Sequence, residues 1–403
     1  MLTLAEAQAA IAERIVAAGK TETVPLRAAA GRYTAAELRA AVDNPAFDNS
    51  AMDGYALCTP DLVTNSFVLP QAGEARCGDA PGRLASNTCQ RIFTGAPLPA
   101  GADTVEIQEN VRLEPGCVVF PRTVQPGQNI RRQGEDFKRD DALYGPGRRL
   151  TVYDLALLSA AGVAAIPVYA RPRALVVATG DELVAPGTPL QPGQIYESNR
   201  LVTLLQLEAL GVETVDGGVV RDDAGALRDM LKSAADYDFV ITSGGASVGD
   251  HDLVKQVFAR IGEINFWKVK IKPGKPVAFG RVGERGHFFA LPGNPVSSLV
   301  TFKLFVEPAL AAWHHARYRL VELPALADND FRRHAGRMEF LRARLGLRDG
   351  RLHATALHGQ GSHMLGPLRQ TNGFIRLAED STGFTAGDTV AAIPLGLGGE
   401  GWD

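Results

Sequence analysis

Apolar residues recur with helical spacing in two stretches of the first 170 positions. Thr3 and Glu6 have the spacing of a capping box, and the apolar positions that follow predict an amphipathic helix near the amino end. A second helix is predicted over Val152–Ala161, and Gly162 after it can take the left-handed conformation that ends many helices. Between the two helices, residues 44–137 consist of short apolar runs separated by proline and glycine turns, which predicts a small β-rich unit.

Residues 171–317 alternate short apolar strands with amphipathic helices. The predicted strands are Arg173–Ala178, Val212–Val215, Asp238–Thr242 and Phe288–Leu291. The predicted helices are 201–210 with Asn199 as its cap, a helix from Asp222 or Asp223 to Ala235, Asp252–Ile261, and Val296–Trp313. Repeated strand–helix–strand units predict a parallel sheet with helices on both faces. Ligands of such sheets bind at the carboxyl ends of the strands, so the loops there form the candidate site.

From residue 318 onward the pattern returns to alternating strands. The runs MEFLRARL, RLHATAL, NGFIRLA and DTVAAIPL are short, alternate in polarity and are separated by glycine turns. This part of the chain therefore predicts a small barrel or sandwich.

Composition narrows the function classes. The 403 residues are enough for two to three domains, at about 150 residues each. The net charge is −3, from 42 basic and 45 acidic residues, so the chain has no general positive field. We expect no nucleic-acid partner and no membrane partner, and an anion site must be built locally. The four cysteines lack metal-site spacing, and no secretory signal pattern opens the chain, so we expect a cytoplasmic protein.

The strongest local signal is the stretch INFWKVKIKPGKP, residues 264–276. It holds four of the nine lysines of the chain, namely Lys268, Lys270, Lys272 and Lys275. On one continuous strand the first three would share a face, and three aligned ammonium groups favour phosphate or another oxyanion as ligand. The alternative is an edge strand that lysine protects against aggregation. The rigid Pro-Gly-Lys-Pro turn favours the anion site, because edge protection does not need it.

A glycine-rich loop follows the predicted strand DFVIT. Gly244 and Gly245 lie at its start, where backbone N–H groups can approach a phosphate at a helix amino end. Asp250 and Asp252 can bind a divalent cation there, or they can simply cap the helix.

The same loop contains the pattern G-x-S-x-G around Ser247, which is typical of serine hydrolases. Neither an HGGG-type motif nor the tight turn of such enzymes accompanies it, so we do not favour a nucleophilic Ser247.

Two more acidic loops are expected at the same sheet edge. Asp181 and Glu182 follow the strand RALVVA, and Asp222 and Asp223 follow GVVR. Each pair alone is explained by turn chemistry. Together with the lysines they favour a site for a metal ion and a polyphosphate. We do not expect the G-x-G-x-x-G at 396–401 to be a dinucleotide site, because it is not seen to open a helix.

Motifs across almost the whole chain resemble one family, in consistent order. They are NPAFDNSAMDGYA (44–56), IFTGAPLPAGADTVEIQE (92–109), QGED (133–136), ATGDEL (178–183), ESNR (197–200), ITSGGASVGDHD (241–252), FWKVKIKPGKP (266–276) and ALPGNPVSS (290–298). Together they resemble the molybdopterin molybdotransferases, the MoeA-type enzymes, which are similar to the E domain of gephyrin.

The resemblance implies an α/β plus β fold of four domains. The first is an elongated helical linker domain at 1–43 and 138–170, and an inserted β-rich domain at 44–137 interrupts it. A central three-layer α/β domain similar to the molybdopterin-binding fold follows at 171–317, and a C-terminal β-barrel at 318–403. The first helix of the linker domain can instead pack on the α/β domain. It also implies a homodimer whose active cleft is shared between subunits.

The implied reaction is Mg²⁺-dependent insertion of molybdate into adenylylated molybdopterin, with release of AMP, in molybdenum cofactor biosynthesis. A molybdopterin adenylyltransferase would hand over the substrate. The catalytic positions carried over are Asp53, Thr94, Asp136, Glu182, Asp222 and Asp252, of which Glu182, Asp222 and Asp252 are the expected metal ligands. The substrate- and anion-binding positions are Gly244, Gly245, Ser247, Lys268, Lys272, Lys275, Pro292, Pro295 and Ser362.

Two other functions remain open from the sequence. One is a nucleotide or pterin hydrolase or deamidase built on the same α/β unit. The motifs MDGYA and FTGAPLP favour the transferase over it. The other is a non-catalytic scaffold, which the intact acidic loops disfavour. His251, between Asp250 and Asp252, departs from the family pattern, and we expect it to be a solvated turn residue.

Overall fold

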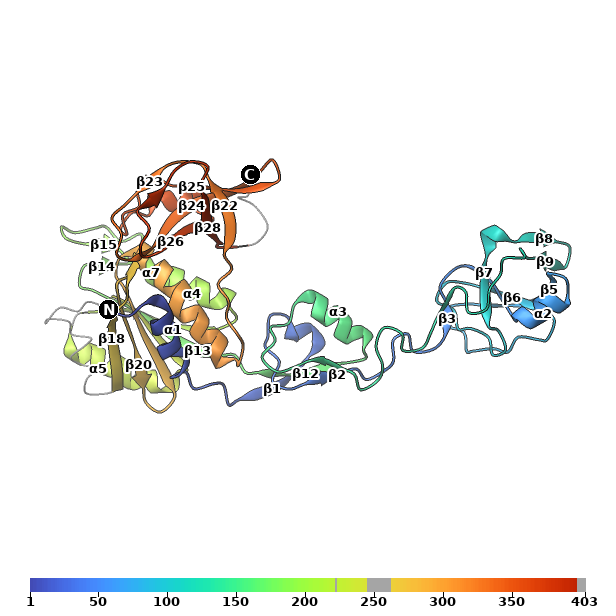
Figure 1. Ribbon diagram of the computed structural model, residues 1–403. Helices are drawn as coiled ribbons and strands as arrows, with labels where there is room; N and C mark the ends of the chain where they lie inside the picture. The colour runs from blue at the N-terminus through green and yellow to red at the C-terminus, as the bar shows by residue number, and fades with distance from the viewer. Residues whose placement is uncertain (222, 245–261, 397–403) are drawn as a thin grey trace. The chain divides into compact units, whose positions relative to one another are not determined.

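The computed structural model describes residues 1–221, 223–244 and 262–396, and the chain forms two compact units (Figure 1). The large unit comprises Met1–Glu22, Gly31–Tyr33 and Val168–Asp403, and the small unit comprises Thr23–Ala30 and Thr34–Pro167. The predicted helix Asp252–Ile261 lies outside the described residues. The division into four domains stays a prediction.

The small unit is built on a six-stranded mixed sheet, as the alternation of short apolar runs and turns predicts. The strand order is β7 (Thr104–Ile107), β4 (Gly54–Leu57), β6 (Cys89–Ile92), β5 (Val68–Ala75), β9 (Cys117–Val119) and β8 (Arg112–Glu114). Helix α2 (Thr59–Thr64) contributes Leu62 to the core, which packs with Leu57, Leu69 and Cys89.

Short elements continue this part of the chain. They are β1 (Thr21–Pro25), β2 (Leu38–Arg39), β3 (Asn49–Ser50), β10 (Ile130–Arg131), β11 (Ala142–Tyr144), α3 (Val152–Ala160) and β12 (Ala165–Tyr169). Helix α3 confirms the helix predicted there. It begins with a capping box in which Thr151 and Asp154 each accept from the other's backbone N–H.

The large unit opens with α1 (Leu4–Ala12), which confirms the first predicted helix. Thr3 and Glu6 form the predicted capping box, in which the Thr3 hydroxyl accepts from the Glu6 N–H. Ala7 and Ile11 are buried on its inner face.

A six-stranded sheet forms the centre of the large unit. Its order is β16 (Glu213–Val220), β13 (Arg173–Thr179), β17 (Phe239–Ser243), β21 (Gly286–Leu291), β20 (Pro276–Val282) and β18 (Gly262–Lys268). The first four strands are parallel to one another, β20 pairs antiparallel with β21, and β18 pairs antiparallel with β20. The predicted strands of this region are confirmed.

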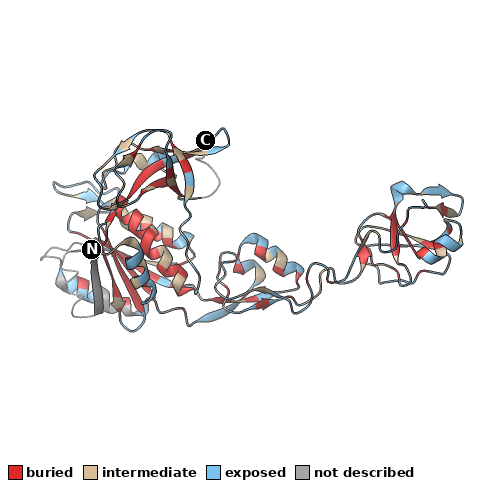
Figure 2. Ribbon diagram, in the orientation of Figure 1, coloured by how far each residue is buried: buried red, intermediate tan, exposed pale blue. Residues whose placement is uncertain are grey.

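Helices cover both faces of this sheet, and alternate residues along each strand face opposite layers. Leu175, Val177 and Val240 pack with Leu227 of α5 (Ala224–Ser233). On the other side, the Phe239 ring lies 6.4 Å from the ring of Trp313, centroid to centroid. The result is the three-layer arrangement that the sequence predicts, with buried residues concentrated in the strands (Figure 2).

One helical run is continuous over Pro295–Trp313 and comprises α7 (Pro295–Thr301), a π-helical turn (Phe302–Val306) and α8 (Glu307–Trp313). By length and composition it is the one described helix that could cross a membrane. In this structure 72% of it is buried, which agrees with its place beside the sheet.

The C-terminal strands close into a five-stranded barrel, which confirms the predicted barrel. Its order is β24 (Met338–Arg348), β25 (Arg351–Ala356), β22 (Leu323–Ala327), β28 (Thr389–Pro394) and β26 (Gly373–Leu377), with β26 pairing back to β24. A short pair of β23 (Phe331–Arg332) and β27 (Gly383–Phe384) lies beside it, and β19 (Ile271–Lys272) adds parallel to β24. The predicted fold class is confirmed.

One predicted cap is wrong. Helix α4 (Asn199–Ala209) begins at Asn199 itself, and its N-cap is Ser198. The Asn199 side chain instead donates to the Gly293 carbonyl at 2.8 Å, so it joins two loops rather than closing its own helix.

Candidate active site

Three loops meet at the carboxyl ends of β13, β17 and β21, where the parallel sheet predicts the ligand site. Gly244 lies at the centre, with a φ of +97°. A Cβ placed there would lie 2.7 Å from Thr179 Oγ1 and 2.8 Å from the Thr179 carbonyl oxygen. The Gly244 N–H donates to the Leu291 carbonyl at 3.0 Å. Only glycine fits this contact, which brings the three strand ends together.

Glu182 is exposed just beyond the end of β13. Its carboxylate lies next to Gly180, and no ion-pair partner for it is found among the described residues. The loop continues into a two-stranded pair of β14 (Leu183–Val184) and β15 (Ile195–Tyr196). A free carboxylate at a strand end is available to a cation.

The ESNR motif supports the third loop from behind. Asn199 holds the Gly293 carbonyl, as described above. Glu197 is 4% exposed, and its carboxylate accepts from the Arg200 N–H at 2.6 Å. Asn199 therefore supports the turn between Pro292 and Pro295, a role that the sequence interpretation did not assign to it, and Glu197 fixes the start of its own helix.

Ser362 reaches the same turn from the barrel. Its carbonyl accepts from the Val296 N–H, in the first turn of α7, at 3.0 Å. Pro295 opens this helix, and Pro292 is buried beneath the turn. Ser362 was predicted as a substrate-binding position, and the structure places it beside the Pro292–Pro295 turn of the same chain.

Arg342 was missed by the sequence interpretation, although it holds the loop that carries Ser362. Its side chain is fully buried and donates to the carbonyls of Gly359, Gly361 and Met364, at 3.0 Å for Gly361. Burial lowers the pKa of its guanidinium. Local alternation gave no signal for it, because Arg342 lies on the face of MEFLRARL opposite to the residues that form the barrel core.

The lysine stretch does not form one continuous face, which corrects the prediction. Strand β18 ends at Lys268, Lys270 lies in a bend, and Lys272 belongs to β19. Strand β18 is at the edge of its sheet, as the alternative interpretation assumed. The strip breaks because the chain leaves the α/β sheet at Lys268 and pairs with the barrel three residues later, from Ile271.

The barrel neutralises two of these lysines. Lys270 Nζ lies 2.8 Å from Glu379 Oε1, and this hydrogen bond raises the pKa of Lys270. Lys272 Nζ lies 2.8 Å from Glu339 Oε1. Lys268 and Lys275 are exposed and have no ion-pair partner in the part of the chain that the structure describes. The positive charge of the site is therefore smaller than the count of lysines suggests.

The Pro-Gly-Lys-Pro turn is packed against α7. Gly274 has a φ of +100°, and a Cβ there would lie 2.6 Å from the Thr301 methyl carbon. The Val269 N–H donates to the Lys275 carbonyl at 2.9 Å and closes the turn. Since α7 also begins at the Pro292–Pro295 turn, one helix positions both turns.

Asp53, Thr94 and Asp136 lie in the small unit. Asp53 Oδ1 accepts from both the N–H and the hydroxyl of Thr94, at 2.8 Å each. The backbone hydrogen bond from Thr94 is the main cause of the lowered pKa of Asp53. Asp136 accepts instead from the Asn44 amide at 2.9 Å. The first two predicted residues form a pair, and no described contact joins Asp136 to them.

Comparison with known proteins decides the family. The chain is 39% identical over 401 residues to the molybdopterin molybdenumtransferase of Haemophilus influenzae, covering 98% of this chain and 99% of that protein. It is 36% identical over 410 residues to molybdopterin molybdenumtransferase 2 of Mycobacterium tuberculosis, covering 98% and 100%. The chain belongs to the molybdopterin molybdenumtransferase (MoeA) family.

Family models and solved structures agree with this membership. Residues 2–162 match the MoeA N-terminal region (domain I and II), residues 175–312 a probable molybdopterin binding domain, and residues 324–395 the MoeA C-terminal region (domain IV). A crystal structure of a MoeA protein from Pyrococcus horikoshii superimposes with a TM-score of 0.83 at 30% identity, covering 98% of this chain and all of that one.

The expected metal ligands of this MoeA family member are only partly described. Of the three, Glu182 is placed, whereas Asp222 and Asp252 lie outside the described residues. So do Gly245, Ser247 and His251. Among the described residues, no group of three or more His, Cys, Asp or Glu side chains has the arrangement of a metal site. Glu182 is therefore the described carboxylate on which a metal proposal rests.

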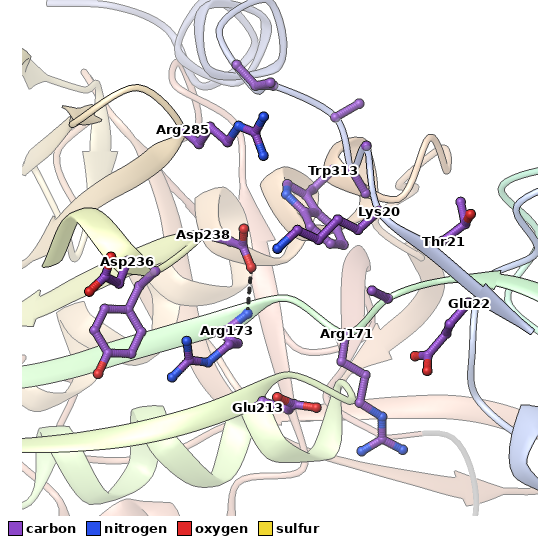
Figure 3. A pocket seen from close by; sticks show the side chains of 16 residues that line it. Lys20, Thr21, Glu22, Arg171, Arg173, Glu213, Asp236, Asp238, Arg285 and Trp313 are labelled. Atoms are coloured by element: carbon purple, nitrogen blue, oxygen red, sulfur yellow. Dashed lines mark hydrogen bonds between the residues drawn. The ribbon is translucent and has the colours of Figure 1, made fainter. Parts of the chain in front are cut away.

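A cavity of about 1000 Å³ lies at the opposite edge of the sheet, at the amino ends of β13, β16 and β17 (Figure 3). Trp313 and the segment Val16–Glu22 contribute to its wall, and the Arg173 N–H donates to Asp238 Oδ2 there at 2.8 Å. Its charged lining residues are Lys20, Arg171, Arg173, Arg285, Glu22, Glu213, Asp236 and Asp238. The equal numbers of both signs do not favour an anion, so this cavity is not the predicted oxyanion site.

Proposed function

We propose that this MoeA family member inserts molybdate into adenylylated molybdopterin and releases AMP, with the help of Mg²⁺. Two observations support this: three loops meet at the ends of the strands, and the lysine turn packs on α7, the helix that begins at one of these loops. Gly244 joins the loops after β13, β17 and β21. Gly274 lets the lysine turn pack on helix α7. The names of the curated relatives give the reaction class.

The charges of the two substrates explain the need for lysines. Molybdate and the pyrophosphate link of the adenylylated pterin are both anions and repel each other. Lys272 and Lys275 flank the short turn at Gly274 and are both exposed, so their ammonium groups would be available to the two anions. Preorganised cations let two anions approach without reorganising at the moment of reaction.

Mg²⁺ binding is proposed at Glu182, Asp222 and Asp252. Carboxylate oxygens are the ligands that Mg²⁺ prefers, together with substrate phosphates. Glu182 fits this role because it is exposed at a strand end without a described cationic partner. The ion would neutralise phosphate charge when bound.

We further propose that the protein acts as a cytoplasmic homodimer. The predicted site residues are divided between the two units, with Asp53 and Thr94 in the small unit and Glu182 in the large one. In the proposed dimer, the small unit of one subunit completes the cleft of the other. A molybdopterin adenylyltransferase would supply the substrate, because the reaction consumes an adenylylated pterin.

The proposed function is tested by AMP release. The purified protein is incubated with adenylylated molybdopterin, molybdate and Mg²⁺, and AMP is quantified over time. We expect release that depends on molybdate. Release at the same rate without molybdate would instead support a hydrolase, and no release at all would reject the proposal.

A further inference from the structure

Glu339 is a buried carboxylate between two cations. It is 2% exposed and lies on β24 of the barrel. One of its oxygens lies 2.8 Å from Lys272 Nζ, and the other lies 3.4 Å from Arg333 Nη1. The Lys272 side chain is 48% exposed, so Glu339 contacts its ammonium group from the protein interior while solvent or a ligand can reach it from outside.

We infer that Glu339 is a positioning residue that holds the Lys272 ammonium at the oxyanion site. An ammonium group has three N–H donors, and Glu339 takes one of them. The two that remain are directed away from the buried carboxylate. The inference rests on the proposed function only in taking an oxyanion as the ligand of Lys272.

Arg333 fixes Glu339 in turn. The Arg333 side chain is 4% exposed and donates to the carbonyls of Arg337 and Ala378. A buried guanidinium with backbone partners cannot move far without losing them. Arg333, Glu339 and Lys272 therefore form a chain of contacts from the barrel interior to the solvent.

The backbone supports the same geometry. Lys272 and Glu339 are direct neighbours in the parallel pairing of β19 with β24. Neighbouring residues on paired strands are close enough for their side chains to interact on one face. The backbone of Lys272 is therefore held by the strand pairing, and its Nζ is held by the Glu339 carboxylate. The turn at Gly274 then packs against α7.

Lys270 and Glu379 provide a matched comparison. They also form a lysine–glutamate pair at 2.8 Å between the lysine stretch and the barrel. Both side chains are partly exposed, at 36% and 42%, and neither is assigned to the site. An exposed pair of this kind contributes little, because water and salt screen it.

The inference predicts that removing the negative charge of Glu339 weakens molybdate binding, which is opposite to what charge alone would give. Removing a negative charge near an anion site should strengthen anion binding if charge alone matters. If Glu339 holds Lys272 in place, Glu339→Gln should instead weaken binding. We expect the dissociation constant for molybdate to rise on the order of tenfold, as for loss of one charge-assisted hydrogen bond.

The experiment is titration calorimetry of molybdate into the full-length protein, without the pterin substrate. The variants are Glu339→Gln, Glu339→Asp, Lys272→Met, the double variant Lys272→Met/Glu339→Gln, and Glu379→Gln. We expect Glu379→Gln to stay within about threefold of the wild type. The double variant should bind no more weakly than Lys272→Met alone, because Glu339 acts through Lys272.

Each outcome bears on the inference. Tighter or unchanged binding by Glu339→Gln would overturn it, as would additive effects in the double variant or absence of molybdate binding in the wild type. Circular dichroism verifies that each variant folds. If Glu339→Gln does not fold, Glu339→Asp replaces it, and an unchanged dissociation constant for molybdate in Glu339→Asp would overturn the inference. In the AMP-release assay, Glu339→Gln should raise KM for molybdate more than it lowers kcat. If binding follows the expected pattern but AMP release fails, the proposed function is wrong and the positioning role stands.

Discussion

Thr94 donates two hydrogen bonds to a single carboxylate oxygen of Asp53, one from its backbone N–H and one from its hydroxyl. Both bonds favour the charged carboxylate, with the backbone bond as the larger effect on its pKa. The pair links two motifs that are 41 residues apart in the chain.

Thr94→Val should raise the pKa of Asp53 toward its ordinary value but not fully to it. The hydroxyl donor is lost, whereas the backbone donor stays. Carboxyl-carbon NMR titration measures this shift, and Thr94→Ser is the control that keeps the donor. A pKa unchanged in Thr94→Val would show that the hydroxyl does not act on Asp53.

Gly244→Ala should destabilise the large unit by about 2–4 kcal/mol, because it combines a left-handed backbone with a clash against the Thr179 backbone. Gly187→Ala is the matched control. Gly187 has a φ of +90° with nothing within 4 Å, so it carries only the conformational cost of about 1 kcal/mol. Urea unfolding compares the two, and equal losses would exclude the close contact.

Arg342→Met should cost about 2–4 kcal/mol, because a fully buried guanidinium loses its hydrogen bonds to three carbonyls of the loop. The loop carrying Ser362 should also become sensitive to limited proteolysis. Arg344→Met, at an exposed position two residues along the same strand, serves as control. An intact loop in Arg342→Met would mean that Ser362 is held by the Val296 contact alone.

His287 makes the stability of the large unit depend on pH. Burial lowers its pKa to about 4 from the ordinary 6.5, and its Nε2 accepts from the Val16 N–H at 3.2 Å. The unfolded chain therefore binds this proton more readily than the folded one. Its contribution is fully present above about pH 6.5 and is lost as the pH falls toward 4, up to about 3 kcal/mol.

His287→Gln cannot titrate, so its unfolding free energy should fall less steeply over this pH range. Denaturant unfolding at pH 7, 5.5 and 4.5 measures the difference. His363→Gln, at an exposed position, should keep the slope of the wild type. An unchanged slope in His287→Gln would assign the pH dependence to other groups.

The proposed shared cleft predicts complementation between two inactive variants. Asp53→Ala removes a predicted site carboxylate from the small unit, and Glu182→Ala removes one from the large unit. Unfolding and refolding them together should form mixed dimers with one intact site, whereas each variant alone stays inactive. The double variant in a single chain, mixed with itself, is the control. Absence of recovered AMP release would place each complete site within one subunit.

Local patterns predicted much of the fold. The capping box of Thr3 and Glu6 and the apolar run at Arg173–Thr179 are set by neighbours in sequence, and both were located correctly. Asn199 was misassigned because its partner, Gly293, is 94 residues away. A side chain that can cap a helix or join two loops has the same local signature in both cases.

The sequence predicted which loops form the candidate site, but it did not predict how many of the lysine charges there are neutralised by acidic partners. The lysines were evident from their density, but their pairing depends on where the barrel lies. Glu339 and Arg342 are buried charges on opposite faces of strand β24, and only the face of Glu339 contributes to the barrel core. Only tertiary contacts show which buried charges have partners, so the net field at Lys272 could not be deduced from composition.

The pairing of β19 with β24 has a consequence for dissecting the protein. Lys272 belongs to the segment that precedes the barrel, while the strand that supports it comes from within the barrel. A fragment ending near residue 317 would retain the lysine turn and lose both its strand partner and its carboxylate. Measurements on the isolated α/β segment would therefore describe a different anion site from that of the whole chain.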